Sequence, residues 1–340
     1  MFGNIYGLDL GTYEIKVYDK KRDAIWKEKN AVAIANERQR ISAGDEAYAM
    51  FEKAPSHIEI QFPMKEGVIS HFNSMQYLLE NLLKKEKQFA RGSKYVVAVP
   101  TDVTEVEKRA FFDLVVHSTA RAKEVRIVER GVADALGLGL DVENEPGVFV
   151  VNLGAETMEL TILSYGGVVL NKMLKIGAKS FDNSIIYSVR CNHEFLIGKL
   201  TAEELRKTFG IYLEQKHQVL TASGRNLITR IPEQKHISMS LVRTAMKDTM
   251  KACIYEINSL LERTPPEIQR LIKNNGIYVC GGLANLSGLT DYMSSALGIK
   301  THTVPEPELC AVRGLKKVIE SKERMKMTYS MLDENYRWMR

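Results

Sequence analysis

The fold is decided by Val148-Phe-Val-Val-Asn-Leu-Gly-Ala-Glu-Thr-Met-Glu-Leu-Thr-Ile-Leu163, which has the pattern of a β-hairpin. Residues 148–151 predict one apolar strand, residues 160–163 predict a second, and Gly154 to Thr157 form the turn between them. A small turn that contains glycine lets backbone N–H groups approach an anion closely. A single hairpin of this kind is weak evidence for a ligand, because most hairpins bind nothing.

A second stretch near the start of the chain has the same plan. An apolar run, a turn at Gly11-Thr12 and another apolar run follow one another in Ile5-Tyr-Gly-Leu-Asp-Leu-Gly-Thr-Tyr-Glu-Ile-Lys-Val-Tyr18. Two matching hairpins far apart in one chain predict a duplicated architecture. Each half would carry one phosphate-binding turn, and a cleft would lie between the halves.

Composition sets the broad class of the protein. The chain has 340 residues, of which 45% are hydrophobic, so a large core and more than one domain are expected. The net charge of +5 suits an anionic membrane surface or a nucleotide, although many soluble proteins are similar. No apolar stretch approaches the roughly 18 residues of a membrane-spanning helix, and the N-terminus lacks the pattern of a signal peptide. The four cysteines are widely spaced and match no zinc pattern, so we expect a reduced, cytoplasmic chain. We find no nucleic-acid motif.

Hydrophobic periodicity predicts the elements around the two hairpins. Residues 5–35 read as a β-meander of four strands, residues 45–53 as a short helix and residues 72–85 as an amphipathic helix. Thr104 and Glu107 predict a capping box at the start of a further helix, and Thr201 with Glu204 is interpreted in the same way. Residues 240–261 predict a long helix. Its expected buried side consists of Leu241, Ala245, Met250, Cys253, Ile254, Ile257 and Leu261.

Several motifs in one order resemble a known superfamily. Gly-Leu-Asp-Leu-Gly-Thr at residues 7–12 is similar to the first phosphate loop of actins, DnaK-type chaperones and sugar kinases. The hairpin at 148–163 resembles their second phosphate loop, and residues 279–288 resemble their adenosine loop. Further stretches resemble one branch, the MreB/Mbl family of bacterial actins, in which this chain looks like a divergent member. These stretches are residues 99–110, 133–140, 196–204, 223–227 and 311–314.

The resemblance implies an α/β protein with the actin-like ATPase fold. In this fold, duplicated ribonuclease H-like domains flank a nucleotide cleft, and each domain carries a smaller subdomain. Domain I would comprise residues 1–142 and 312–340, with its small subdomain at about 33–75. Domain II would comprise residues 143–311, with its small subdomain at about 180–240.

The resemblance also assigns residues to ATP and Mg²⁺. Asp9 would hold magnesium through water, because this ion prefers oxygen ligands and keeps several waters. The alternative is a solvated or turn aspartate, although an acid between Leu8 and Leu10 in a buried strand needs a partner. Lys16 falls where actins have a phosphate-contacting lysine, and Glu204 could serve the nucleoside or only a helix cap. The implied nucleotide-binding residues are Asp9, Gly11, Thr12, Tyr13, Lys16, Asn152, Gly154, Ala155, Thr157, Glu204, Lys207, Gly281, Gly282 and Leu283.

The sequence departs from the family pattern at the reaction centre. Arg130 stands where the family has the glutamate that positions the attacking water, and a guanidinium can only donate hydrogen bonds. Glu129 remains as a catalytic candidate, but it is one residue away and its side chain should point elsewhere. In the second loop, Asn152 replaces an aspartate, and Ala155 and Glu156 replace glycines. These changes predict impaired hydrolysis of ATP, and they leave open impaired binding of the nucleotide as well.

Two segments have alternative interpretations. Residues 84–94 are basic and include Phe89, and they correspond to a membrane-contacting loop of the family or to a solvated loop. Residues 321–340 carry an apolar stripe at helical spacing, flanked by basic residues. The stripe consists of Met325, Tyr329, Leu332, Tyr336 and Met339. This tail fits an interfacial or partner helix, or a terminal helix that is docked on its own domain or partly disordered.

The resemblance implies a cytoskeletal protein that forms filaments on the inner face of the cytoplasmic membrane. Its partners would be copies of itself or MreB paralogues, together with the cell-wall elongation machinery, and it would not bind nucleic acid. One alternative is a non-hydrolysing subunit that copolymerises with an active paralogue. A small-molecule kinase of the same superfamily is the third alternative, although the second loop shows no convincing carboxylate base for it.

Overall fold

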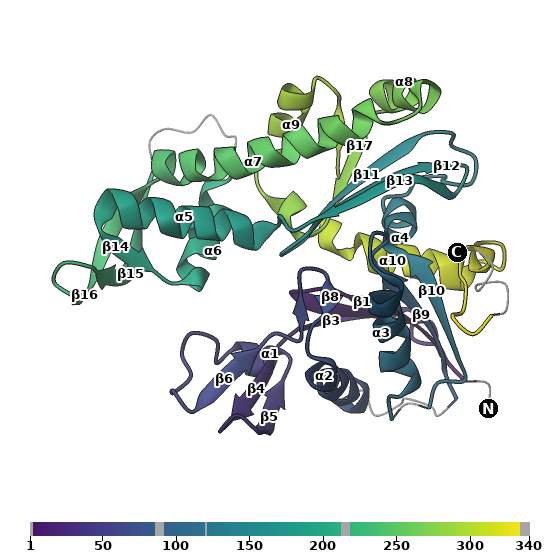
Figure 1. Cartoon of the computed structure of the whole chain (residues 1–340), viewed down its shortest axis with the longest axis horizontal. Helices are drawn as coiled ribbons and strands as arrows, with labels where there is room; N and C mark the ends of the chain where they lie inside the picture. Colours follow the sequence, from purple (N-terminus) through teal and green to yellow (C-terminus); the bar gives the residue numbers. More distant parts are fainter. Residues whose placement is uncertain (1–2, 86–91, 120, 212–217, 334–340) are drawn as a thin grey trace. The chain divides into compact units, whose positions relative to one another are not determined.

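The computed structural model describes residues 3–85, 92–119, 121–211 and 218–333 (Figure 1). The chain divides into two compact units. Unit 1 contains residues 1–150, 161–173 and 309–340, and unit 2 contains residues 151–160 and 174–308. In the described part of the chain, every helix is too short or too polar to cross a membrane.

Unit 1 is built on a five-stranded sheet of order β10-β9-β1-β2-β3. The strands β1 (Ile5–Leu10), β2 (Glu14–Asp19) and β3 (Ala24–Lys29) form an antiparallel meander. On the other side of β1, β9 (Lys94–Val99) and β10 (Glu124–Glu129) run parallel to it. The other elements of unit 1 up to residue 137 are β4 (Val32–Ala35), β5 (Gln39–Ala43), α1 (Asp45–Tyr48), β6 (Ile58–Gln61), β7 (Met64–Lys65), β8 (Val68–Ile69), α2 (Phe72–Lys85), α3 (Glu105–Val116) and α4 (Arg130–Gly137).

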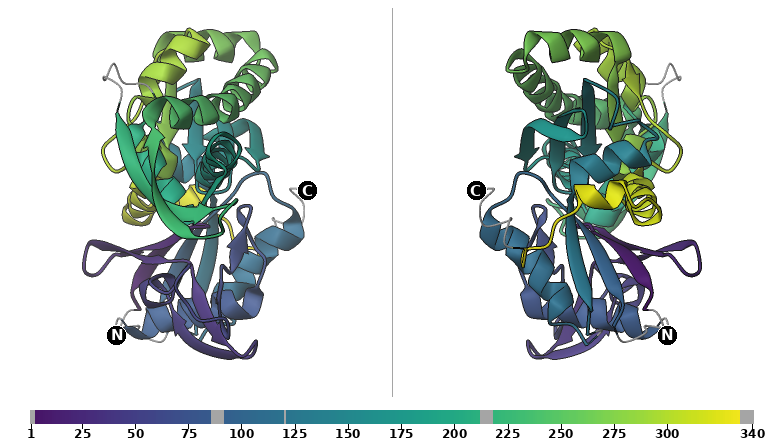
Figure 2. Two further views of the ribbon diagram at one scale, coloured as in Figure 1. Left: turned by 90° about the vertical axis from the view of Figure 1, so that its left-hand side faces the viewer. Right: turned by 90° about the vertical axis from the view of Figure 1, so that its right-hand side faces the viewer.

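The alternation of side chains along β1 divides unit 1 into two layers. Tyr6, Leu8 and Leu10 enter a core that also contains buried side chains of α2 and α3, and Figures 1 and 2 show these helices beside the sheet. Gly7 faces the opposite way, against Leu315 of α10 (Cys310–Glu320). Asp9 therefore belongs to the α10 face of the sheet, because successive residues of a strand alternate.

A second five-stranded sheet has the order β13-β12-β11-β17-β18. It repeats the plan of the first, with three consecutive strands followed by two later ones, which confirms the predicted duplication. The hairpin predicted at residues 148–163 is present. Its first strand, β11, ends directly before the turn at residues 154–157, and its second strand, β12, begins directly after it. The strands are β11 (Val148–Leu153), β12 (Met158–Ser164), β13 (Gly167–Leu174), β17 (Ile277–Cys280) and β18 (Thr301–His302).

Unit 2 contains a three-stranded antiparallel sheet and several helices. The sheet has the order β14-β15-β16, and α5 packs against both α6 and α7. The elements are α5 (Ala178–His193), β14 (Phe195–Ile197), α6 (Lys199–Phe209), β15 (Val219–Asn226), β16 (Pro232–Ser238), α7 (Met239–Glu262), α8 (Pro266–Asn275) and α9 (Leu289–Leu297). Short 3₁₀ turns lie at Gly282–Asn285 in this unit, and at Pro307–Leu309 and Arg324–Met327 elsewhere in the chain.

Three predicted elements differ from the structure. The fourth strand of the predicted meander, β4, belongs to a separate sheet of order β5-β4-β6, and the bend at Asn30 separates it from β3. The helix predicted over residues 45–53 ends at Tyr48. In α7, the first half buries Val242 and Met246 rather than Leu241 and Ala245.

The predicted tail helix is wrong for the described residues of the tail. Tyr329 forms an antiparallel bridge with Ile127 of β10, and the preceding residues form a 3₁₀ turn rather than an α-helix. The tail contacts its own domain as far as residue 333, as the docked-helix alternative expected, but these residues form no α-helix. Tyr336, Met339 and the predicted loop residue Phe89 lie outside the described residues.

Candidate functional site

Asp9 and Lys16 face each other across the first hairpin. They are directly opposite in the register of β1 and β2, so both side chains lie on the same face of the sheet. The Lys16 Nζ donates a hydrogen bond to Asp9 Oδ2 over 3.5 Å. Asp9 is 5% exposed and Lys16 is 8% exposed. A buried carboxylate needs a polar partner, and Lys16 supplies it.

Arg130 adds a second cation to the same carboxylate. It is the first residue of α4, directly after β10, and its side chain reaches past the end of β9 to β1. The Arg130 Nε lies 3.7 Å from Asp9 Oδ1, and its Nη2 donates to the carbonyl oxygen of Leu10 over 3.1 Å. Arg130 is 6% exposed. Arg130, which stands at the family's usual glutamate position, therefore contacts Asp9 and Leu10 directly before the first loop.

This arrangement does not fit a magnesium ion on Asp9. The carboxylate already has two cationic side-chain groups within 4 Å. A hydrated metal ion would need the negative charge of this carboxylate, which the two cations already balance. Among the described residues, no group of three or more His, Cys, Asp and Glu side chains is placed to hold a metal. The metal assignment of Asp9 stays a prediction that the geometry does not favour.

The first loop is held by a residue that sequence analysis missed. Gly11 N–H donates to the Glu14 carbonyl over 3.1 Å, which closes the turn. Asn30 is fully buried, and its Nδ2 donates to the Gly11 carbonyl over 2.8 Å while its N–H donates to the Tyr13 carbonyl over 2.9 Å. A polar residue between two strands was the available signal for this role. Thr12 is buried within the loop.

Tyr13 points from the first loop toward α1. Its hydroxyl lies 3.2 Å from the Tyr48 hydroxyl, and the Lys29 Nζ lies 4.0 Å from the centre of its ring. Lys29 also forms an ion pair with Glu14 over 2.5 Å. Tyr13 is thereby tied to the β3–α1 region of unit 1.

The second loop is attached to the start of α5. Gly154 N–H donates to the Thr157 carbonyl, and the Gly154 and Ala155 carbonyls accept from the first two N–H groups of α5. The Glu156 carboxylate forms an ion pair with Lys179 over 2.5 Å. A carboxylate at this position would repel a phosphate if it pointed inward, and Lys179 offsets that charge.

The structure brings the second loop and the predicted adenosine loop together. A Cβ atom on Gly281 would lie 2.5 Å from Asn152 Oδ1 and 2.4 Å from the Leu153 carbonyl. The backbone at Gly281 has φ +87°, which favours glycine. Gly282 has open space around its Cα, and the Leu283 side chain is buried. Asn152 and Gly281 thus form one contact within unit 2.

The predicted cap of α6 is wrong. The helix begins at Lys199 with Gly198 as its N-cap, so Thr201 lies inside the first turn. Glu204 is exposed on the helix, and Lys207 forms an ion pair with Glu203 over 2.6 Å. The cap interpretation of Glu204 is therefore excluded, and its nucleoside role stays a prediction.

Two buried groups were not predicted from the sequence. Arg206 of α6 donates to Asp182 of α5 over 2.6 Å, and both residues are buried. Burial raises the pKa of the Asp182 carboxyl, and the Arg206 guanidinium partly offsets this. The two residues are 24 positions apart in the sequence, so no local sequence pattern predicts their contact.

Glu129 points away from the cluster of Asp9, Lys16 and Arg130. Its Oε1 accepts a hydrogen bond from the Tyr329 hydroxyl over 3.0 Å and lies 3.5 Å from the Lys108 Nζ. Burial raises the pKa of this carboxyl, and Lys108 and Tyr329 partly offset the effect. These contacts give Glu129 a structural role in holding the tail.

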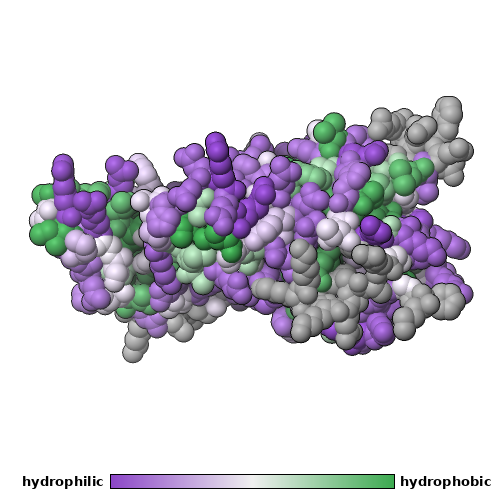
Figure 3. Space-filling view, turned by 90° about the horizontal axis from the view of Figure 1, so that it is seen from below, coloured by the Kyte–Doolittle hydropathy of each residue, from purple (hydrophilic) through white to green (hydrophobic). Residues whose placement is uncertain are grey.

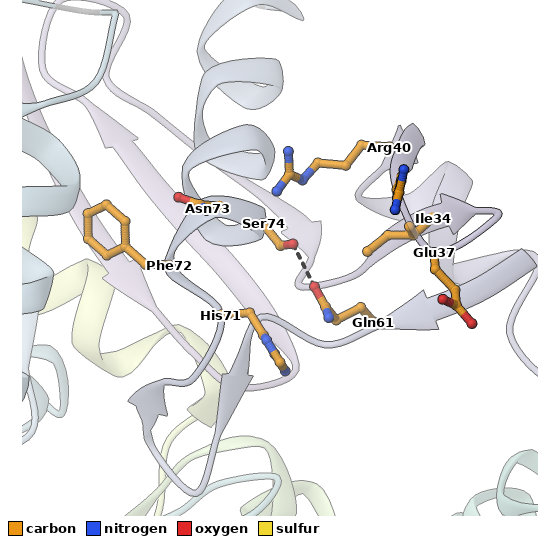
Figure 4. A pocket seen from close by; sticks show the side chains of 9 residues that line it. Ile34, Glu37, Arg40, Gln61, His71, Phe72, Asn73 and Ser74 are labelled. Carbon is orange, nitrogen blue, oxygen red and sulfur yellow. Dashed lines mark hydrogen bonds between the residues drawn. The ribbon is translucent and has the colours of Figure 1, made fainter.

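A surface hollow lies in unit 1 away from the predicted site residues. It is bounded by the β4–β5 turn and the start of α2, and Ser74 donates to Gln61 across it over 2.5 Å (Figure 4). Its lining residues are Ile34, Glu37, Arg38, Arg40, Gln61, His71, Phe72, Asn73 and Ser74. None of these residues was assigned to ATP or magnesium.

Comparison with known proteins decides the family. Residues 3–327 match the family described as MreB/Mbl protein. The chain belongs to the MreB/Mbl family. It is 32% identical over 329 residues to the cell shape-determining protein MreB of Escherichia coli K12, with 94% of each chain covered. It is 26% identical to the cell shape-determining protein Mbl of Bacillus subtilis 168, with 96% of this chain and 98% of Mbl covered.

Solved structures confirm the actin-like ATPase fold for this MreB/Mbl chain. MreB 5 of Spiroplasma citri bound to AMPPNP superposes with a TM-score of 0.90 at 26% identity, with 96% of this chain and 98% of that one covered. The same protein bound to ADP gives a TM-score of 0.89 at 27% identity over the same shares. MamK in a double helical filament gives 0.77 at 20% identity, with 94% and 99% covered, and supports the fold alone.

The contact between Gly281 and Asn152 gives a first prediction about this MreB/Mbl chain. Gly281→Ala is expected to lower the free energy of unfolding by about 1–2 kcal/mol, because its Cβ meets backbone atoms in a conformation that alanine rarely adopts. The matched control is Gly282→Ala, which has open space and should be neutral. Thermal unfolding followed by circular dichroism measures both, and equal losses would contradict the assigned contact.

Proposed function

We propose that this chain is a cytoskeletal subunit that binds ATP, assembles into filaments and hydrolyses ATP weakly or not at all. The membership of the MreB/Mbl family and the curated relatives named as cell shape-determining proteins support the cytoskeletal role. The AMPPNP and ADP complexes of MreB 5 from Spiroplasma citri support nucleotide binding. The filaments would lie on the inner face of the cytoplasmic membrane and organise cell-wall synthesis, as the family resemblance implies.

The observation that carries the hydrolytic part is the placement of Arg130. Attack of water on a γ-phosphate needs an acceptor that orients the water, and a guanidinium only donates. Arg130 is also engaged with Asp9 and the Leu10 carbonyl, and the neighbouring Glu129 points toward Lys108 and Tyr329. No carboxylate at this junction of β10 and α4 is thus directed at the first loop.

Exposed apolar side chains on unit 2 support self-association. Ile228 and Ile231, in the turn between β15 and β16, are 71% and 61% exposed. Hydrophobic residues also appear at this end in Figure 3, on a face where hydrophilic residues predominate. Apolar groups clustered on a soluble surface are typical of contacts between proteins.

Phosphate release from ATP with magnesium tests the hydrolytic part. We expect the natural chain to remain at the buffer rate and Arg130→Glu to gain at least about tenfold, since a positioned acceptor contributes roughly 10²–10⁴-fold. Arg109→Glu, an exposed arginine of α3, makes the same charge change and should gain nothing. Turnover by the natural chain at the rate of an active MreB measured beside it would overturn the proposal.

Sedimentation with ATP tests assembly and separates the alternative. A chain that forms homopolymers pellets alone, whereas a copolymer subunit pellets only with an active MreB paralogue. If neither mixture pellets at any nucleotide condition, the filament part of the proposal is wrong.

A further inference from the structure

We propose that nucleotide binding by this chain needs no divalent cation, because Arg130 and Lys16 supply the positive charge at the first phosphate loop. This inference rests on the nucleotide binding proposed above. All the residues that carry it lie in unit 1, on one face of the β10-β9-β1-β2-β3 sheet.

The geometry places both cations on one carboxylate. Lys16 reaches Asp9 Oδ2 over 3.5 Å from the opposite strand, and Arg130 Nε lies 3.7 Å from Asp9 Oδ1. The Arg130 Nη2 is fixed to the carbonyl of Leu10, the residue directly before Gly11. The guanidinium therefore sits at the base of the loop, where a metal-dependent member of the superfamily would need its magnesium.

The charge of the cluster decides how a phosphate is received. A lone carboxylate at this position repels a phosphate, and a metal ion must screen the two. Here two cations face the single carboxylate of Asp9, so the cluster of Asp9, Lys16 and Arg130 carries a net charge of +1. The cluster therefore presents no net negative charge that a metal would have to neutralise.

The chemistry of the two cations suits a nucleotide. A guanidinium is a planar fork of donors that matches phosphate as well as carboxylate, and a lysine ammonium is a compact point charge. Burial of all three side chains strengthens their interactions, because little water screens them. The ligand class is a nucleoside di- or triphosphate without a bound metal.

The test is titration of the full chain with fluorescent N-methylanthraniloyl-ATP, in excess magnesium and in excess EDTA. We expect the two Kd values to agree within about threefold. Arg130→Gln should weaken binding about tenfold in EDTA, since it removes a charge-assisted contact. Arg109→Gln removes an exposed arginine of α3 and should leave both values unchanged.

Asp9→Asn gives opposite results for the two kinds of site. In a metal-dependent site it removes the metal's anchor and weakens binding. Here it removes the anion that competes with phosphate for Arg130 and Lys16, so binding in EDTA should tighten several-fold, by about 3- to 10-fold. If this variant does not fold, the magnesium and EDTA titrations of the natural chain still decide the matter.

The outcomes separate this inference from the proposed function. Binding in magnesium that is lost in EDTA overturns the inference and leaves nucleotide binding in place. Absence of binding in both solutions overturns the inference together with the proposed ATP binding. The inference also predicts that Arg130→Glu binds the probe only when magnesium is present. This variant places two carboxylates at the loop, and a metal ion is then needed to neutralise them.

Discussion

Replacing Arg206 by methionine is expected to lower the free energy of unfolding of unit 2 by about 3–5 kcal/mol. The Arg206 Nε donates to Asp182 Oδ1 over 2.6 Å, and its Nη2 lies 3.4 Å from Oδ2. Methionine keeps much of the volume but leaves the Asp182 carboxylate buried without its cation. The pair also joins α5 to α6, so its loss weakens the packing of two helices.

The loss should depend on pH. Burial raises the pKa of Asp182 above its ordinary value, and Arg206 counteracts this. Without Arg206 the folded-state pKa rises further above the unfolded one. A raised carboxyl pKa contributes stability at low pH that is lost as pH rises through the folded value. The deficit of Arg206→Met should therefore be larger at about pH 7.5 than at about pH 5.

Thermal unfolding at the two pH values measures this prediction. Lys207→Met is the matched control, because the next residue along α6 has an exposed side chain and a pair with Glu203 that is worth about 1 kcal/mol at most. A deficit for Arg206→Met as small as that of the control, or one that grows as the pH falls, would show that the buried pair does not stabilise unit 2.

The second large effect is expected for Gly314→Ala. A Cβ on Gly314 of α10 would lie 1.8 Å from the carbonyl oxygen of Ala133 in α4, and one on Gly137 of α4 would lie 1.9 Å from the Cys310 carbonyl. The two helices touch through their backbones at both glycines. Alanine must push α10 from α4, at a cost of about 3 kcal/mol that exceeds its gain in helix propensity.

Chemical denaturation of the full chain measures the effect of Gly314→Ala. Gly282→Ala again serves as a glycine-to-alanine control with open space around it. A Gly314→Ala protein as stable as the natural chain would mean that α4 and α10 separate at little cost. The close contact would then not be needed for the stability of unit 1.

Local sequence patterns predicted much of the fold. Both hairpins, the helix over 72–85 and the capping box of Thr104 with Glu107 are present, because each depends on neighbouring residues. In that box, the Glu107 N–H donates to the Thr104 hydroxyl over 3.3 Å and the Glu107 carboxylate accepts from the Thr104 N–H over 2.8 Å.

Features that depend on distant parts of the chain were not predicted. The contact of Arg130 with Asp9 joins α4 to β1, and the Asp182–Arg206 pair joins two helices. Thr201 has the sequence of a cap, yet the N-cap is Gly198, three residues before the predicted position, because the chain leaves β14 directly into the helix. The tail stripe has helical spacing, but pairing with β10 overrides that local preference.

The bridge between Tyr329 and Ile127 also protects the sheet of unit 1 from unwanted strand addition. β10 is the outermost strand, and its outer backbone groups would otherwise be a template for another chain. The tail occupies them: Ile127 N–H donates to the Tyr329 carbonyl, Tyr329 N–H donates back, and Arg126 holds Thr328. This margin of the unit 1 sheet is thereby closed to aggregation through strand pairing.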